Sequence, residues 1–252
     1  MRSMIDYHVL TLFPDQVTTY FNTSITGRAL TKGLAGLECL YIRDFATNDY
    51  GKIDDTMYGG GTGLLIRCEP VYRAWSKVVE KCESKGRPRP HTVYMSPKGY
   101  VFDQNKAKEL ASYEDLIIIC GHYEGIDARV IDEICDEEIS IGDYILTGGE
   151  TAAIVVMDAV TRLIPGVLPN EEAYTNESHT EGILEAPQYT KPPVWHDREV
   201  PEVLKNGNDA LIDDYNHTAA LLETLKKRPD MFNKLELTED EIKKVLALQK
   251  SL

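Results

Sequence analysis

The stretch Asp115-Leu116-Ile117-Ile118-Ile119-Cys120-Gly121 decides the fold, because it sets an unbroken apolar run between an aspartate and a glycine. A half-exposed strand alternates apolar and polar residues. A short continuous apolar run is instead typical of a parallel strand that helices cover on both faces. We therefore expect residues 116–120 to form a strand inside a sheet.

Further strand and helix patterns alternate on both sides of this run. The candidate strands are residues 5–9, 38–42 and 92–95, and the candidate helices are residues 16–31, 69–85, 103–111, 126–134 and 150–163. Such alternation predicts an α/β fold, in which a parallel sheet carries helices on both faces.

The C-terminal third has a different composition. Residues 165–193 are rich in Pro, Asn, Glu, Ser and Thr and show little periodicity, so we interpret them as an interdomain linker. Residues 207–227 and 238–250 have helical patterns, and Thr238 with Glu241 forms a capping-box signature. The predicted organisation is an α/β domain over residues 1–164, the linker over 165–193 and a small helical domain over 194–252.

Charge and composition limit the class of protein. The formal net charge is -14, from 27 basic and 41 acidic residues, which gives no support to non-specific nucleic-acid binding. The 5 cysteines include no pair at Cys-x-x-Cys spacing, so the sequence predicts no metal site, and their scatter fits a reducing compartment. Without a signal-peptide pattern or a run of roughly 20 apolar residues, we expect a soluble, cytoplasmic protein with no membrane partner.

Four segments combine glycines with polar or aromatic side chains: residues 58–63, 94–99, 120–127 and 140–150. The first matches neither the P-loop nor the dinucleotide-binding pattern, and a flexible surface turn explains it equally well. Each of the others, taken alone, is compatible with an ordinary strand–turn–helix connection. Three glycine-bearing strand ends in one α/β domain, however, predict a pocket built from loops at one edge of the sheet.

These segments resemble the tRNA (guanine(37)-N1)-methyltransferase family, whose marks run in order along nearly the whole chain. The matching stretches are Leu12-Phe13-Pro14, Thr26-Gly27-Arg28-Ala29, Arg43-Asp44-Phe45, Asp54-Asp55-x-x-Tyr58-Gly59-Gly60-Gly61, Cys120-Gly121-x-Tyr123-Glu124-Gly125-Ile126-Asp127, Ser140-Ile141-Gly142-Asp143-Tyr144, Asp158-Ala159-Val160-x-Arg162-x-Ile164-Pro165-Gly166-Val167-Leu168 and Tyr189-Thr190-Lys191-Pro192.

The resemblance implies a trefoil-knotted (SPOUT) methyltransferase, a fold that topology rules alone would not predict because knots are almost absent from proteins. It also implies S-adenosylmethionine as methyl donor, a dependence on magnesium, tRNA as substrate and a homodimer with shared active sites. The residues that it assigns to cofactor binding are Tyr94, Met95, Ser96, Pro97, Gly121, Tyr123, Glu124, Gly125, Ile141, Gly142, Tyr144, Leu146, Gly148 and Gly149.

Methylation of guanine at N1 requires the loss of the N1 proton. A carboxylate can accept this proton, and a cation near O6 stabilises the charge that develops. The resemblance assigns the base to Glu177, where the family has aspartate, the catalytic arginine to Arg162, and an acidic position near substrate or metal to Asp54. From the residues alone, the two acids would be solvated and Arg162 would complement a helix dipole.

The chain departs from the family in the candidate helix 207–227, where Asp213 and Asp214 replace basic residues and would repel phosphates. The basic clusters at residues 85–89 and 226–228 are either compensating RNA contacts or ordinary solvated faces. Three functions stay open: a methyltransferase acting on guanine 37 of tRNA, beside the anticodon; a knotted methyltransferase acting on a different RNA; and a catalytically silent RNA-binding relative.

Overall fold

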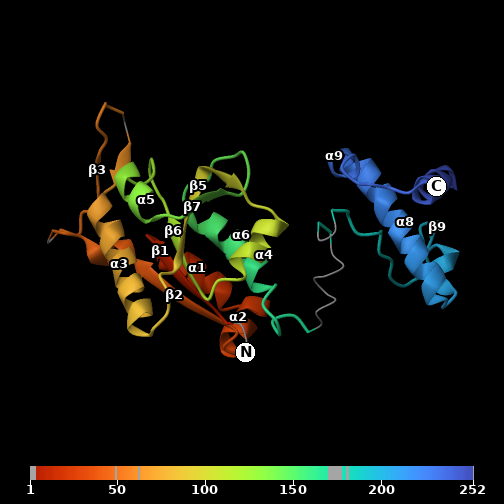
Figure 1. Cartoon of the computed structure of the whole chain (residues 1–252), viewed down its shortest axis with the longest axis horizontal. Coiled ribbons are helices and arrows are strands. Elements are labelled where there is room, and N and C mark those ends of the chain that lie inside the picture. The colour runs from red at the N-terminus through yellow and green to blue at the C-terminus, as the bar shows by residue number, and fades with distance from the viewer. Residues whose placement is uncertain (1–3, 49, 62, 170–177, 180–181, 252) are drawn as a thin grey trace. The chain divides into compact units, whose positions relative to one another are not determined.

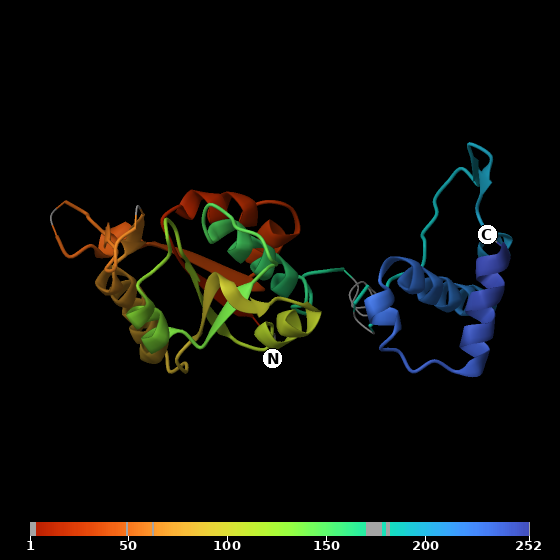
Figure 2. The same cartoon turned by 90° about the horizontal axis from the view of Figure 1, so that it is seen from above.

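Figures 1 and 2 show the computed structural model, which describes residues 4–48, 50–61, 63–169, 178–179 and 182–251. The chain divides into two compact units, Met1–Glu171 and Glu172–Leu252. Each unit is described by itself.

The first unit contains a five-stranded sheet with the strand order β2-β1-β6-β5-β7. Every neighbouring pair in it is parallel, which confirms the predicted α/β class with a parallel sheet. The strands are β1 (Ile5–Thr11), β2 (Ala35–Tyr41), β5 (His91–Val101), β6 (Asp115–Cys120) and β7 (Glu137–Ser140).

The predicted interior strand is β6, which pairs with β1 on one side and β5 on the other. All six of its residues are buried. Leu116, Ile118 and Cys120 belong to one apolar cluster, and Ile117 and Ile119 belong to another. Because successive side chains of a strand point to opposite faces, β6 fills the core on both sides of the sheet.

Helices cover both faces of this sheet (Figure 1). One cluster joins the sheet to α1 (Pro14–Phe21), α2 (Ser24–Thr31), α4 (Gln104–Leu110) and α6 (Glu150–Thr161). The other joins it to α3 (Cys68–Ser84), α5 (Ala128–Ile134) and the short 3-10 helix η1 (Ile42–Phe45). These helices begin and end close to the bounds that the sequence patterns predicted.

The candidate helix 16–31 is an exception, because the structure divides it into α1 and α2. Thr23 adopts an extended conformation and Ser24 has a φ of 52°. The Thr23 hydroxyl donates to the Tyr20 carbonyl oxygen at 2.7 Å. Such a side chain competes with the helix for backbone groups, which explains the break.

The predicted end of β5 before Pro97 is also wrong, because the strand continues to Val101. Its pairing with β7 shifts in register between Met95 and Tyr100. Proline donates no backbone hydrogen bond, and an irregular strand position tolerates it. Two further short strands, β3 (Asp54–Thr56) and β4 (Leu64–Ile66), form an antiparallel hairpin that the sequence patterns did not reveal.

The second unit contains three helices in its described part, together with a short hairpin of β8 (Val194–Trp195) and β9 (Arg198–Glu199) and the 3-10 helix η2 (Glu202–Lys205). The helices are α8 (Asp209–Lys227), α9 (Pro229–Phe232) and α10 (Glu239–Ser251). Leu221 and Leu222 of α8 pack with Val245 of α10.

The predicted capping box forms at the start of α10. The Thr238 backbone N–H donates to Glu241 Oε2 at 2.8 Å, and the Glu241 N–H donates to Thr238 Oγ1 at 3.3 Å. Among the described residues, no helix is both long and apolar enough to span a bilayer.

Replacing Ile118 with alanine tests the central position of β6. Ile118 is 1% exposed, so we expect the Ile118→Ala variant to lower the free energy of unfolding of the first unit by about 2–5 kcal/mol. The measurement is urea unfolding followed by the fluorescence of Trp75, in a Trp195→Phe background. Val101→Ala, at a residue that is 54% exposed, is the control and should cost less than about 0.5 kcal/mol. Equal effects of the two substitutions would contradict the assignment.

Candidate functional site

The carboxyl ends of β5, β6 and β7 lie side by side at one edge of the sheet. Met95 of β5 is in register with Cys120 of β6 and with Ile139 of β7. Beyond these residues lies a cavity of about 380 Å³, a size within the usual range of small-molecule sites. The three glycine-bearing strand ends therefore meet at one place, as the sequence predicted.

All of the residues that the resemblance assigned to cofactor binding line this cavity. They come from three segments, the end of β5, the loop after β6 and the stretch between β7 and α6: Tyr94, Met95, Ser96, Pro97, Gly121, Tyr123, Glu124, Gly125, Ile141, Gly142, Tyr144, Leu146, Gly148 and Gly149. The cavity is also lined by residues that had no predicted role, among them Lys98, His122, Asp132 and Thr147.

The loop after β6 turns tightly over Tyr94. A Cβ added at Gly121 would lie 2.7 Å from the Tyr94 hydroxyl oxygen, so a larger residue would displace that side chain. Tyr123 and Gly125 have φ values of 60° and 115°, in the region that glycine tolerates best. Burial raises the pKa of Tyr94 to about 12, so its hydroxyl keeps its proton at neutral pH.

The main chain directly before α6 packs against the main chain of the loop that follows β6. The Gly149 N–H donates to the Gly121 carbonyl oxygen at 2.9 Å, and His122 forms an antiparallel bridge with Gly148. A Cβ at Gly149 would lie 2.8 Å from Cα of Cys120. Because a backbone atom cannot move aside as a side chain can, this position has room for glycine alone.

A buried acid holds the first turn of α6 against the end of β1. Glu150 is 2% exposed, and its Oε1 accepts a hydrogen bond from the Thr11 hydroxyl at 2.7 Å. Thr11 Oγ1 in turn accepts the Phe13 N–H at 2.9 Å. A carboxylate at a helix N-terminus is also stabilised by the helix dipole. The sequence patterns assigned no role to Glu150, although an acid directly after two glycines was the available signal.

The hairpin of β3 and β4 is attached to the cavity rim. The Ile66 N–H donates to the Gly125 carbonyl oxygen at 3.0 Å, and the Glu124 N–H donates to the Leu64 carbonyl oxygen at 3.1 Å. Between the two strands, Gly59, Gly60 and Gly61 have φ values of 86°, 84° and 139°. The glycine loop therefore connects β3 to β4, next to the predicted pocket.

Two of the predicted catalytic residues, Asp54 and Arg162, are not part of the cavity lining that the described residues form. Asp54 begins β3 and is paired with Ile66 in the hairpin. Arg162 is the C-cap residue of α6, the position that the dipole interpretation predicted. Glu177 lies outside the described residues.

The two arginines of the basic segment 85–89 are bound within the first unit. The Arg87 guanidinium donates to Asp6 at 2.7 Å and to Asp115 at 2.9 Å. Arg89 donates to Asp136 at 2.8 Å and to the Ile134 carbonyl oxygen at 2.6 Å. These contacts favour a structural role for both side chains over a role in contacting phosphates.

Comparisons with known proteins give a consistent result over nearly the whole chain. The profile of the family described as tRNA (Guanine-1)-methyltransferase TrmD matches residues 5–234. A tRNA (guanine-N(1)-)-methyltransferase of Ruminiclostridium cellulolyticum is 49% identical over 91% of this chain and 97% of its own length. Proteins of the same name from Dehalococcoides mccartyi (48% identical, 93% of each chain) and Lachnospira eligens (45% identical, 90% of this chain and 95% of its own) are similar to it as well.

An acid at the start of α5, next to the cavity, leads to a prediction of pH dependence. Asp127 caps α5, with its Oδ1 accepting the Arg129 N–H at 3.0 Å, and the Arg129 guanidinium holds the pKa of this carboxyl well below its usual range. A lowered pKa stabilises the folded chain above the pKa of the unfolded state, near pH 4, and this contribution is lost as the pH falls.

We therefore expect Asp127→Asn to lower the free energy of unfolding at pH 7 while the difference from wild type shrinks between about pH 5 and pH 3. Urea unfolding at several pH values measures this difference. Glu133→Gln, at an exposed position of the same helix, is the control and should change the free energy of unfolding at pH 7 by less than about 0.5 kcal/mol. A difference for Asp127→Asn that stays constant down to pH 3 would refute the coupling.

Proposed function

The chain belongs to the tRNA (guanine-1)-methyltransferase family, and from this membership we propose that it transfers a methyl group from S-adenosylmethionine to N1 of guanine 37 of tRNA, beside the anticodon. The observation that carries the proposal is the convergence of all the predicted cofactor residues on one cavity at the carboxyl ends of β5, β6 and β7. Ligands of parallel sheets bind at such edges.

The cavity fits a nucleoside that carries a charged side chain. Glycines at 121, 142, 148 and 149 leave backbone groups open to close approach, while Ile141 and Leu146 offer apolar contacts to a base. The Glu124 carboxylate offers an acceptor for hydroxyl or ammonium groups. S-adenosylmethionine, when bound, supplies a methyl group on a positively charged sulfur.

We extend the proposal to a trefoil knot in the first unit. The hydrogen bond between Gly149 and Gly121 and the bridge between His122 and Gly148 tie the chain after β7 to the loop after β6. A chain that passes through that loop would make such contacts. The crowding of Gly149 against the backbone of Cys120 supports the same path.

The proposed chemistry divides between three residues. Glu177 would accept the N1 proton of guanine, so that the N1 electron pair can bond to the methyl carbon while the bond from that carbon to sulfur breaks and a neutral thioether leaves. Arg162 stabilises the negative charge that develops at O6. The hairpin bound to Gly125 carries Asp54 close to the rim, where its carboxylate would bind the substrate or magnesium. Magnesium prefers oxygen ligands and is often held by one or two carboxylates with water, so this residue fits the ion.

We propose that the active enzyme is a homodimer whose subunits share each active site. Three large apolar side chains support this proposal. Phe13 directly precedes α1, Tyr20 lies on α1 and Val155 lies on α6, and each is 42–44% exposed in the single chain. Tyr20 and Asp158 link the two helices through a hydrogen bond of 3.2 Å. Exposed apolar groups of this kind are typical of interfaces.

In this proposal the second unit, with α8 and its neighbours, contacts the tRNA, and residues 165–193 deliver Glu177 to the base. The enzyme would act in the cytoplasm, where its five free cysteines stay reduced. The acidic Asp213 and Asp214 of α8 favour one alternative, a methyltransferase of this fold that acts on a different RNA.

Nucleoside mass spectrometry on a tRNA transcript with guanine at position 37 tests the function. We expect 1-methylguanosine to form with S-adenosylmethionine and to be absent when that guanine is replaced by adenine. Methylation of another RNA alone would support the alternative, and donor binding without turnover on any RNA would indicate a silent relative.

The Glu177→Gln variant tests the base. An amide of the same shape cannot accept the proton, so turnover should fall at least about 100-fold while the affinity for S-adenosylmethionine is unchanged. Calorimetry measures the affinity and single-turnover methylation measures the rate. Glu171→Gln, another glutamate of the same linker, is the matched control and should leave both unchanged. Full turnover of Glu177→Gln would place the base elsewhere.

A further inference from the structure

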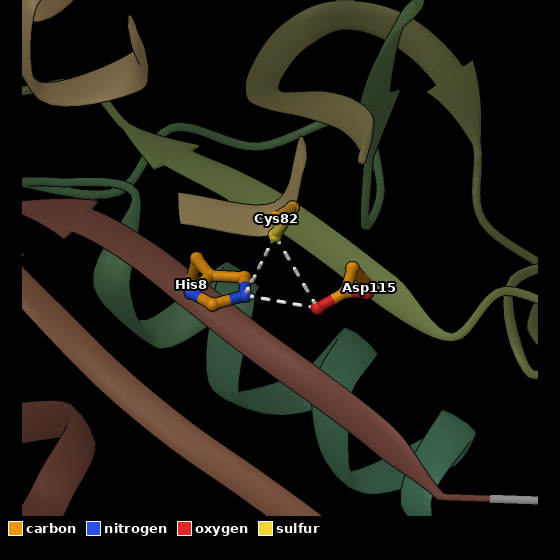
Figure 3. Close-up of side chains that lie close together, drawn as sticks. All are labelled: His8, Cys82 and Asp115. Atoms are coloured by element: carbon orange, nitrogen blue, oxygen red, sulfur yellow. Dashed lines mark hydrogen bonds and ion pairs between the residues drawn. The ribbon is translucent and has the colours of Figure 1, made fainter. Parts of the chain in front are cut away.

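His8, Cys82 and Asp115 form a buried cluster (Figure 3). It lies at the amino end of β6, whereas the cavity lies beyond the carboxyl end of that strand. His8 comes from β1, Asp115 begins β6 and Cys82 lies near the end of α3. Their side chains point toward one another and are 5%, 2% and 5% exposed for His8, Cys82 and Asp115. The cavity begins beyond Cys120, about 16 Å further along the strand, so the cluster is separate from the proposed active site.

The three ligand-type atoms are spaced as a small ion requires. His8 Nε2 lies 3.2 Å from Asp115 Oδ1, Cys82 Sγ lies 3.6 Å from the same oxygen, and the sulfur lies 4.0 Å from Nε2. A triangle with these sides has a centre about 2.1 Å from all three atoms. Zinc binds nitrogen and oxygen at about 2.0–2.2 Å and sulfur at about 2.3 Å, so a small shift of the ion from that plane satisfies all three.

The second ring nitrogen of His8, Nδ1, contacts a carboxylate, as is usual for histidines that bind metals. Nδ1 lies 3.0 Å from Glu38 Oε2, and Lys81 Nζ contacts the same carboxylate oxygen at 2.7 Å. Metal-binding histidines usually donate their other N–H to a carboxylate, which fixes the ring and leaves the first nitrogen free to bind. Glu38 therefore has the position of an outer partner that orients His8.

The charges around the cluster balance with a divalent cation. The carboxylates of Asp6, Glu38 and Asp115 are opposed by the cations Lys81 and Arg87, which contact them directly, and this leaves one negative charge. A Cys82 thiolate would add a second. A divalent ion then neutralises the cluster, which matters because an unpaired charge at a buried site is costly.

A nucleophilic cysteine is the main rival interpretation of a Cys–His–Asp group, and the environment opposes it. Cys82 is 2% exposed, whereas reactive cysteines lie in accessible positions. A metal ion, in contrast, displaces the thiol proton itself and has no need of an open cleft.

We propose that His8 Nε2, Cys82 Sγ and Asp115 Oδ1 bind a zinc-type divalent ion that fastens α3 to the sheet. The mixed nitrogen, sulfur and oxygen ligands suit zinc better than magnesium, which prefers oxygen alone. The ion would join three elements that are distant in sequence and would stabilise the first unit without contact with the cavity.

Cobalt(II) titration of the full-length, tag-free protein, after treatment with a chelator, tests the site. We expect about one equivalent to bind per chain and to produce the near-ultraviolet absorption of a cobalt–thiolate bond. Cys82→Ser should remove this absorption. Cys135→Ser, at a half-buried cysteine that packs on the same apolar cluster, is the matched control and should keep it. Wild-type protein without the band, or Cys82→Ser protein with it, would overturn the proposal.

A second measurement covers the case in which Cys82→Ser does not fold. Zinc affinity, measured by competition with a chromophoric chelator, should be about 10–100-fold weaker in Glu38→Ala, because removal of an outer partner typically has this effect. Zinc should also raise the midpoint of thermal unfolding of the wild type and leave that of His8→Asn unchanged. Equal zinc affinity of wild type and Glu38→Ala, or an equal thermal shift in His8→Asn, would refute the assignment.

Discussion

The burial of β6 on both faces is the constraint on which the rest of the first unit depends. Apolar side chains from both helical layers enclose residues 116–120, so no polar ligand can reach the strand along its length. Chemistry is confined to its two ends. At the amino end Asp115 joins His8 and Cys82, and at the carboxyl end Gly121 begins the loop that lines the cavity.

The loop at the carboxyl end is held from three directions, by one side chain and by two backbone hydrogen bonds. Tyr94 lies beneath Gly121, the Gly149 N–H binds its carbonyl oxygen, and the N–H of Ile66 binds the carbonyl oxygen of Gly125. Because two of these contacts join main-chain groups, they do not depend on the identity of the side chains that line the cavity.

Local sequence patterns predicted those features of the fold that depend on residues close together in the sequence. The apolar run of β6, the amphipathic helices and the glycine-bearing strand ends are local signals, and together they predicted a pocket at one edge of the sheet. The individual cofactor residues came from the family resemblance. The group of His8, Cys82 and Asp115 has no local signal, because its members come together only when β1, α3 and β6 pack. In the same way, the sequence alone suggests that Arg87 lies on a basic surface. The parallel register of β1 and β6 places Asp6 beside Asp115, and Arg87 binds both carboxylates.

The acidic character of α8 has a physical explanation within the second unit. Asp214 Oδ1 accepts a hydrogen bond from Lys244 of α10 at 2.6 Å, and His217 lies 2.9 Å from Glu241 of α10. These groups connect the two helices around the core of Leu221, Leu222 and Val245, so the charge of Asp214 is opposed before any nucleic acid approaches. Fewer phosphate contacts on this helix would make the affinity for tRNA depend less on salt concentration. More of the discrimination would then fall to contacts with the bases.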